Sequence, residues 1–451
     1  MQASSTSDIL KPNFTQRLLQ QVNNSPLIAF RMIFGFLLCY HFLSSIYKGV
    51  IYSSFIAPPF TFTFIGFEFL QPLPGNGMYF YVGIMALFSL LIMLGAWYRI
   101  ATIGLAIMYT AMYLMQKADY NNHYYLLLLL CWIMVFLPAN RYFAIDVKRN
   151  AVKVTNTCHR YYLWIFIAQV AVMYFFAAVA KLSSDWFSGK FIAIQFSGLT
   201  KRFLTGMLYR QEWFQLLICY GGFLFDLLIV PFLLWKRSRN YAFFVSILFH
   251  LFNSYTFSIG IFPYLSIALN LFFLNPKMIQ RFFFRRQDTV TEDEHALPVN
   301  STRSKILLYC FYIYIFFQVI IPMRSWFYPG NVFWTEEGYR MSWKMMMRTK
   351  SGTLYFKVKD PVSKKVWKAE PAKIFAPRQM LWLSTSPDMI WQYAQRLKKE
   401  FEKKGIPNVE VYAIGKVSLN RSEGKAMVDT AVDLCSVKWK MFEHSRWITN
   451  P

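Results

Sequence analysis

The sequence predicts a polytopic membrane protein, an all-α helical bundle of about nine spans followed by a small α+β extracytoplasmic domain. Its 451 residues are 56% hydrophobic and 20% aromatic, and the mean hydropathy is +0.30. This is too apolar for a soluble chain of this length. Apolar runs near the length that crosses a bilayer recur along the first two thirds. The expected spans are 27–47, 79–95, 100–115, 124–137, 161–180, 214–235, 241–253, 258–274 and 306–321.

The basic residues predict both the partner class and the topology. The formal net charge of +25 is spread over loops and the C-terminal third, which favours membrane lipid and argues against nucleic acid. With a cytoplasmic N-terminus, the inner loops collect the basic residues, among them Arg141 and Arg149. We therefore expect a cytoplasmic segment at 1–26, a multi-pass transmembrane domain at 27–321 and an extracytoplasmic domain at 322–451.

Other segments have local signatures of their own. Two short patterns flank Asp360-Pro361 and predict a β-hairpin, and a helix and a further strand are expected downstream. These elements are expected at 352–359, 364–369, 387–404 and 409–419. We also expect an interfacial amphipathic helix at 187–204 and a flexible linker at 287–304. The six cysteines have no paired spacing, so neither a disulfide framework nor a metal site is expected.

Polar residues gather where several apolar runs should meet the outer face. The topology brings six of them to this face: Asn121, Asn122, His123, Lys181, His250 and Asn253. Amides, imidazoles and a lysine at a bilayer boundary suggest proton chemistry on a lipid-soluble substrate. A lysine acts as a base only as the neutral amine, which an apolar environment favours.

Each of these residues also has a structural interpretation. A lysine at a helix end is usually an anchor that reaches the interface, and an interfacial histidine is often simply hydrogen-bonded. His250 and Asn253 could join helices rather than react. Asp226, inside the sixth apolar run, should be paired with another helix, because an unpaired carboxylate is costly there.

The ordered motifs resemble the vitamin K-dependent γ-glutamyl carboxylase family. They are Gln-Pro-Leu-Pro at 71–74, Leu-Gly-Ala-Trp-Tyr-Arg at 94–99, Asn-Asn-His-Tyr-Tyr-Leu at 121–126, Ala-Lys-Leu-Ser-Ser-Asp-Trp at 180–186 and Phe-His-Leu-Phe-Asn-Ser at 249–254. Ser-Trp-Lys-Met-Met at 342–346 resembles a downstream element of the same family. The resemblance runs from about residue 27 to residue 447, with a horizontally transferred transmembrane domain first. It is expected to be a short form that lacks the C-terminal extension of the animal enzymes.

The resemblance implies a carbon–carbon lyase, a carboxylase coupled to vitamin K epoxidation. In this family a base deprotonates vitamin K hydroquinone, of the menaquinone or phylloquinone type, and O2 adds. The alkoxide that results takes a γ-proton from a glutamate of a peptide or protein, and CO2 traps the carbanion. No metal is expected, and a quinone reductase is implied as a functional partner. The compartment would be the bacterial inner membrane or the endoplasmic reticulum, with the C-terminal domain periplasmic or lumenal.

The resemblance also implies roles for particular residues. Lys181 and His123 are the expected catalytic residues of the transmembrane domain. The expected substrate-binding residues are Asn121, Asn122, His250, Asn253, Trp343, Met345 and Arg348. Trp343 and Met345 could instead be core residues, and Arg348 a solvated charge. Two alternatives stay open: a quinol epoxidase that carboxylates no protein, and a non-enzymatic membrane protein that binds quinone or peptide.

Overall fold

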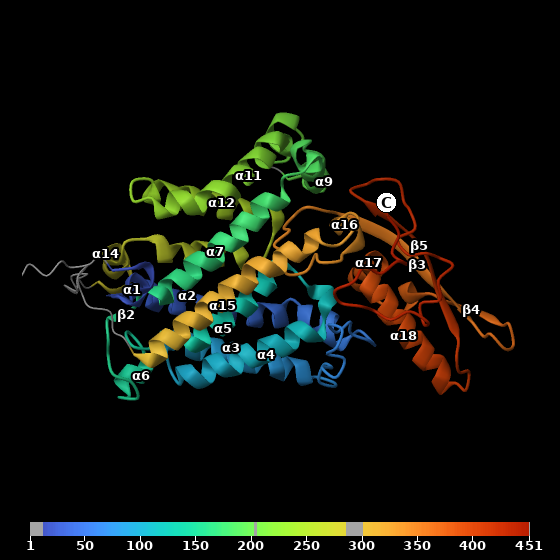
Figure 1. Cartoon of the computed structure of the whole chain (residues 1–451), viewed down its shortest axis with the longest axis horizontal. Coiled ribbons are helices and arrows are strands. Elements are labelled where there is room, and N and C mark those ends of the chain that lie inside the picture. Colours follow the sequence, from blue (N-terminus) through green and yellow to red (C-terminus); the bar gives the residue numbers. More distant parts are fainter. Residues whose placement is uncertain (1–11, 203–204, 286–300, 451) are drawn as a thin grey trace, which may run out of the picture.

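The computed structural model describes residues 12–202, 205–285 and 301–450. Most of the linker predicted at 287–304, and one end of the interfacial segment predicted at 187–204, lie outside these ranges. Within the described part, long helices form one body and a small sheet with two helices forms the other end of the molecule (Figure 1).

Nine helical segments coincide with the nine predicted apolar runs. They are α2 (Ser25–Tyr47), α3 (Gly77–Leu94), α4 (Tyr98–Met115), α5 (Asn122–Phe136), α7 (Arg160–Ala180), α11 (Glu212–Leu234), α12 (Arg239–Phe257), α13 (Phe262–Leu269) with the turn that follows it, and α15 (Thr302–Met323). Among the described helices, six are long and apolar enough to cross a membrane: α2, α3, α4, α7, α11 and α15. The chain is therefore a multi-pass membrane protein, and the number of nine crossings stays a prediction.

Short elements connect these helices. They are α1 (Phe14–Leu19), α6 (Ile145–Lys148), α8 (Ser184–Phe187), α9 (Lys190–Ser197), α10 (Gly206–Tyr209), α14 (Pro276–Ile279), α16 (Val332–Thr335) and the two-stranded pair β1 (Gln21–Asn23) and β2 (Thr157–His159). In place of one interfacial helix, the segment after α7 folds into α8 and α9. The two are joined at Gly189, whose φ of 73° lies in the left-handed region that glycine adopts without a steric penalty.

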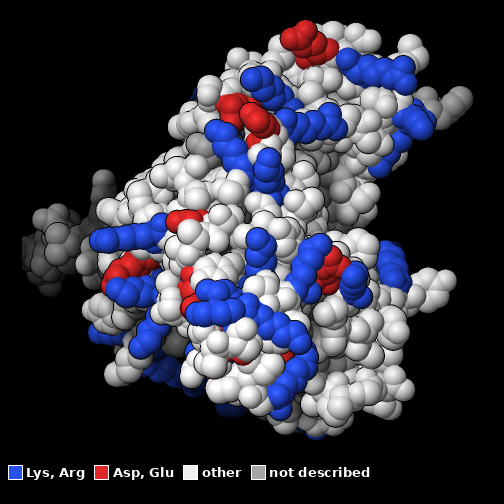
Figure 2. All heavy atoms as spheres, turned by 90° about the vertical axis from the view of Figure 1, so that its right-hand side faces the viewer, with Lys and Arg blue, Asp and Glu red and all other residues white. Residues whose placement is uncertain are grey.

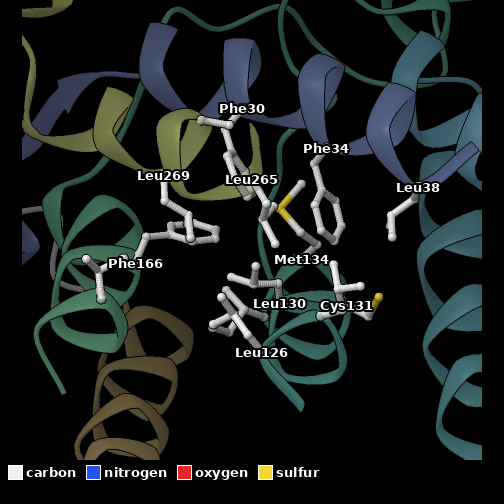
Figure 3. Close-up of a cluster of buried hydrophobic side chains, with 14 of the residues drawn as sticks. Phe30, Phe34, Leu38, Leu126, Leu130, Cys131, Met134, Phe166, Leu265 and Leu269 are labelled. Atoms are coloured by element: carbon white, nitrogen blue, oxygen red, sulfur yellow. The ribbon is translucent and has the colours of Figure 1, made fainter. Parts of the chain in front are cut away.

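The core of the bundle is aromatic and aliphatic. Phe30 and Phe34 of α2 point toward Leu130 of α5, while Phe166 of α7 and Leu265 of α13 close the cluster (Figure 3). These helices are apolar on most faces, because their outward sides are expected to meet lipid rather than water. Packing between them therefore fixes the positions of their polar residues.

The C-terminal end is a three-stranded antiparallel sheet with two helices. The strands β3 (Lys350–Lys359), β4 (Val366–Ala369) and β5 (Glu410–Leu419) lie in the order β4-β3-β5. The helices α17 (Pro377–Thr385) and α18 (Pro387–Lys403) pack against β3 and β5. The hairpin, the long helix and the last strand predicted from the sequence are thus confirmed.

Loops at one end of the bundle help to form the core of this C-terminal part. Phe62, from the segment between α2 and α3, packs with Phe375 at a ring-centroid distance of 5.6 Å. Gln392 of α18 donates a hydrogen bond to the carbonyl oxygen of Thr63 at 3.2 Å. The bundle and the sheet are therefore held together by buried contacts.

Candidate active site

A cavity of about 660 Å³ lies between α7, α11 and α12. Most of its lining is apolar, and several lining residues of α11 and α12, such as Leu217, Leu228 and Val245, are also exposed on the outside of the bundle. Its polar lining includes His123, Tyr174, Lys181, Asp226, His250 and Asn253. An apolar cavity with a few convergent polar groups is the usual form of a binding site for an apolar ligand.

Lys181 is held at the cavity wall by an ion pair. Its Nζ lies 2.5 Å from Oδ2 of Asp226 on α11, and the two side chains are only 8% and 7% exposed. Nζ also donates to the carbonyl oxygen of Ala177 at 3.3 Å and lies 5.1 Å above the ring of Trp186. Asp226 is thus paired with another helix, as the sequence suggested, and its partner is the lysine expected to be catalytic.

His250 is paired with a residue that sequence reasoning missed. The hydroxyl of Tyr174 lies 2.9 Å from Nε2 of His250, and Nδ1 of the same ring is buried with no partner among the described residues. Tyr174 precedes Lys181 by seven residues, two helical turns, which puts both on one face of α7. This seven-residue spacing is the feature of the sequence that could have pointed to Tyr174. Asn253, one turn after His250, also lines the cavity.

His123 stands between two cavities. Its ring stacks on Phe262 with centroids 3.9 Å apart and an angle of 19° between the planes. One side belongs to the main cavity, and the other to a second cavity of about 350 Å³ that His41 and Asn121 also line. Asn121 further accepts a hydrogen bond from the backbone N–H of Tyr124 at 2.8 Å and so caps the start of α5.

Asn122 fixes the segment that carries Trp343 and Met345. Its Nδ2 donates to the carbonyl oxygen of Lys344 at 3.2 Å. Met345 lines the main cavity, whereas Trp343 is fully buried and packs against Tyr125 with ring centroids 5.0 Å apart. Trp343 thus supports the wall behind the cavity rather than lining it.

Arg348 lies apart from the main cavity. Its guanidinium contacts Glu336 and stacks 4.0 Å from the ring of Tyr339. Glu336 is shared with Lys350, whose Nζ lies 2.6 Å from Oε1. Arg348 is therefore already paired with a carboxylate of the chain itself. Its side chain is only 7% exposed, and it is not among the residues that line the cavity.

Within the described residues, no group of three or more His, Cys, Asp or Glu side chains is arranged to hold a metal ion. The polar groups that line the cavity are one lysine, one carboxylate, two imidazoles, two phenols, a serine hydroxyl and an amide. These groups bind hydrogen-bonding ligands and transfer protons.

Comparison with known protein families gives two matches, which follow each other along the chain. Residues 19–277 match the HTTM domain, and residues 303–451 match the lumenal domain of vitamin K-dependent gamma-carboxylase. No solved structure matches the chain. Except for Met345 and Met346, the residues that line the main cavity fall within the first match. With an HTTM domain followed by this lumenal domain, the chain belongs to the vitamin K-dependent gamma-carboxylase family.

Proposed function

We propose that the chain is a vitamin K-dependent γ-glutamyl carboxylase, which forms vitamin K epoxide and carboxylates glutamate side chains of a peptide or protein. The observation that carries this proposal is the position of Lys181. Its amine is buried at the wall of an apolar cavity whose other walls, on α11 and α12, reach the outside of the bundle. A lipid-soluble quinol and a buried basic group would meet there without bulk water.

The cavity fits this substrate by volume and by lining. A site of about 660 Å³ has the size of ordinary small-molecule sites, and its apolar walls suit a quinol ring and part of an isoprenoid chain. Vitamin K hydroquinone, with O2, supplies the strong base that no protein side chain can supply. Lys181, as the neutral amine, would accept a phenolic proton, and Phe249 and Phe225 would keep water out.

The other polar groups would orient the substrate. His250, at the cavity wall, is held in place by the contact of its Nε2 with Tyr174, and the amide of Asn253 would contact a quinol oxygen. His123 faces both cavities, so it would either donate to a quinol oxygen or stabilise the negative charge that forms on the glutamate. We assign the second cavity no separate ligand.

Peptide would reach the site from the C-terminal side, which we propose to be periplasmic or lumenal. Figure 2 shows this end of the molecule, where Lys and Arg side chains outnumber Asp and Glu. Such a surface attracts acidic, glutamate-containing segments. It would equally hold the domain close to anionic lipid headgroups.

The test is an assay of both half-reactions with the purified protein in lipid nanodiscs. Reduced vitamin K, labelled bicarbonate and a glutamate-containing peptide are added together, and epoxide and labelled peptide are measured. Formation of both products supports the proposal. Epoxide without labelled peptide would replace it with the quinol epoxidase alternative, and the absence of both products would favour a binding protein.

A further inference from the structure

The buried ion pair at the cavity wall raises a chemical problem. Asp226 lies inside the apolar helix α11, and among the described residues the only hydrogen bond to its carboxylate comes from Lys181. An ammonium that is paired with a carboxylate at 2.5 Å cannot act as a base. The proton that joins the two groups must leave Nζ before Lys181 can accept another.

Among the described residues, no other Lys, Arg, Asp or Glu lines the cavity to balance either charge. Its other titratable lining groups are His123 on α5, Tyr174 on α7, and Tyr241 and His250 on α12. Two isolated charges in an apolar site cost several kcal/mol each in lost hydration. Transfer of one proton from Nζ to the carboxylate removes both charges at once. The neutral pair of amine and carboxylic acid is therefore close in free energy to the ion pair.

We infer that Asp226 is the positioning residue that takes and holds the proton of Lys181, so that the base of this site is the Lys181–Asp226 pair. This inference rests on the proposed function. An N–H bond of the ammonium breaks as an O–H bond forms on the Asp226 carboxylate, which leaves a neutral amine beside a neutral acid. The amine then accepts the phenolic proton of the quinol and becomes an ammonium, while Asp226 stays protonated until the proton is returned.

The variant that separates this role from others is Asp226→Asn. The amide has nearly the same shape and still offers an acceptor oxygen to Nζ, but it cannot take a proton. Without the negative charge the ammonium loses its only counter-ion, so the amine becomes neutral at lower pH. In each turnover, however, the proton taken from the quinol must leave directly from the ammonium, because the variant has no carboxylic acid that can release it, so quinol epoxidation falls. The inference thus predicts a more reactive lysine in a slower enzyme.

The first measurement needs no substrate. An uncharged amine-reactive reagent is applied to the protein in nanodiscs across a range of pH, and labelling of Lys181 is read by mass spectrometry. We expect Asp226→Asn to move the midpoint of labelling down by about 1 to 3 pH units, and to lower the rate of epoxide formation at least about tenfold, 1.4 kcal/mol in barrier. Glu212→Gln, an exposed change at the start of the same helix, should alter neither.

Asp226→Glu keeps a proton acceptor and should retain both the wild-type midpoint and most of the rate. If Asp226→Asn fails to fold, the inference is tested with Asp226→Glu alone. A folded Asp226→Glu protein that forms no epoxide would overturn the inference. So would an unchanged labelling midpoint in Asp226→Asn, or a shifted midpoint with undiminished turnover. If the wild-type protein forms no epoxide, the proposed function is wrong, even if the labelling midpoint of Lys181 shifts in Asp226→Asn. The role of Asp226 in the reaction would then be wrong as well.

Discussion

Lys117 and Asp388 form an ion pair across the junction between the bundle and the C-terminal part, with Nζ 2.6 Å from Oδ2. Lys117 lies just before α5, and Asp388 lies in the first turn of α18. Arg340 contacts the same oxygen at 2.8 Å. Beside this cluster the hydroxyl of Tyr120 accepts a hydrogen bond from the backbone N–H of Met341 and donates one to Asn122. The junction therefore positions the start of α5, where His123 stands.

Asp388→Asn should destabilise this junction strongly. It leaves two buried cations with no carboxylate, and breaking a buried pair in this way costs about 3 to 5 kcal/mol. We expect a large drop in the thermal unfolding midpoint of the protein in nanodiscs. Glu370→Gln is the matched control, because Glu370 pairs with Lys368 and Lys373 at the surface, where such pairs contribute about 0 to 1 kcal/mol. Equal, small shifts for both variants would show that the junction is not held by Asp388.

The ion pair between Lys117 and Asp388 also predicts how the stability of the fold depends on pH. Burial alone would raise the pKa of Asp388, yet Arg340 and Lys117 hold it well below its usual value. A carboxyl with a lowered pKa in the folded state stabilises the fold fully above its unfolded pKa of about 3.9. That contribution is lost as the pH falls toward the folded value. Burial lowers the pKa of Lys117 to about 8, so the comparison is made below that pH. Between about pH 7 and 5 the gap in unfolding midpoint between wild type and Asp388→Asn should stay constant, and it should narrow only below about pH 4. Narrowing at higher pH would contradict the charged pair.

Lys181→Ala should abolish epoxide formation while the protein still folds. Lys181 is the only lysine among the described residues that line the main cavity. A small amine added to the assay should restore part of the rate, because the truncated side chain leaves space for it. Lys190→Ala removes an exposed lysine at the start of α9 and should have little effect. Equal, mild effects at the two positions would assign Lys181 to anchoring the helix.

His123→Ala should slow the reaction by a few orders of magnitude, as expected for loss of a group that transfers protons or stabilises charge. Phe262→Leu is the matched variant: it removes the ring on which His123 stacks, at 3.9 Å between centroids, but leaves the imidazole in place. We expect a much smaller loss there. Rates are measured for both half-reactions, and a loss as large in Phe262→Leu would mean that the stack, rather than the imidazole, is what the site requires.

The sequence predicted the helices well because their signal is local. Each apolar run became a helix, and the β-hairpin around Asp360 formed where turn residues separate two strand patterns. Lys181 and His250 could be selected as polar residues in apolar surroundings, and the structure places both in one cavity. Tyr174 was missed because a single tyrosine in an apolar helix looks like any other core residue.

The contacts between distant segments could not be predicted in this way. That Asp226 should pair with another helix followed from its cost in an apolar run, but the identity of Lys181 as its partner depends on how α7 and α11 pack. In the same way, nothing local to Arg348 indicates that Glu336, twelve residues earlier in the chain, contacts its guanidinium. The substrate-binding role predicted for Arg348 stays a prediction, and a test of it must also take the contact with Glu336 into account.

Arg348→Ala separates an architectural role from a substrate-binding one. Because Arg348 already contacts Glu336 in a buried cluster with Lys350, we expect its loss to lower the unfolding midpoint and to reduce epoxidation and carboxylation together. Glu336→Gln is the companion variant, since it releases Arg348 without removing it. If Arg348 instead binds the substrate, Arg348→Ala should weaken carboxylation alone, and Glu336→Gln should lower the KM for a glutamate peptide, because the guanidinium would then be free for the substrate carboxylate.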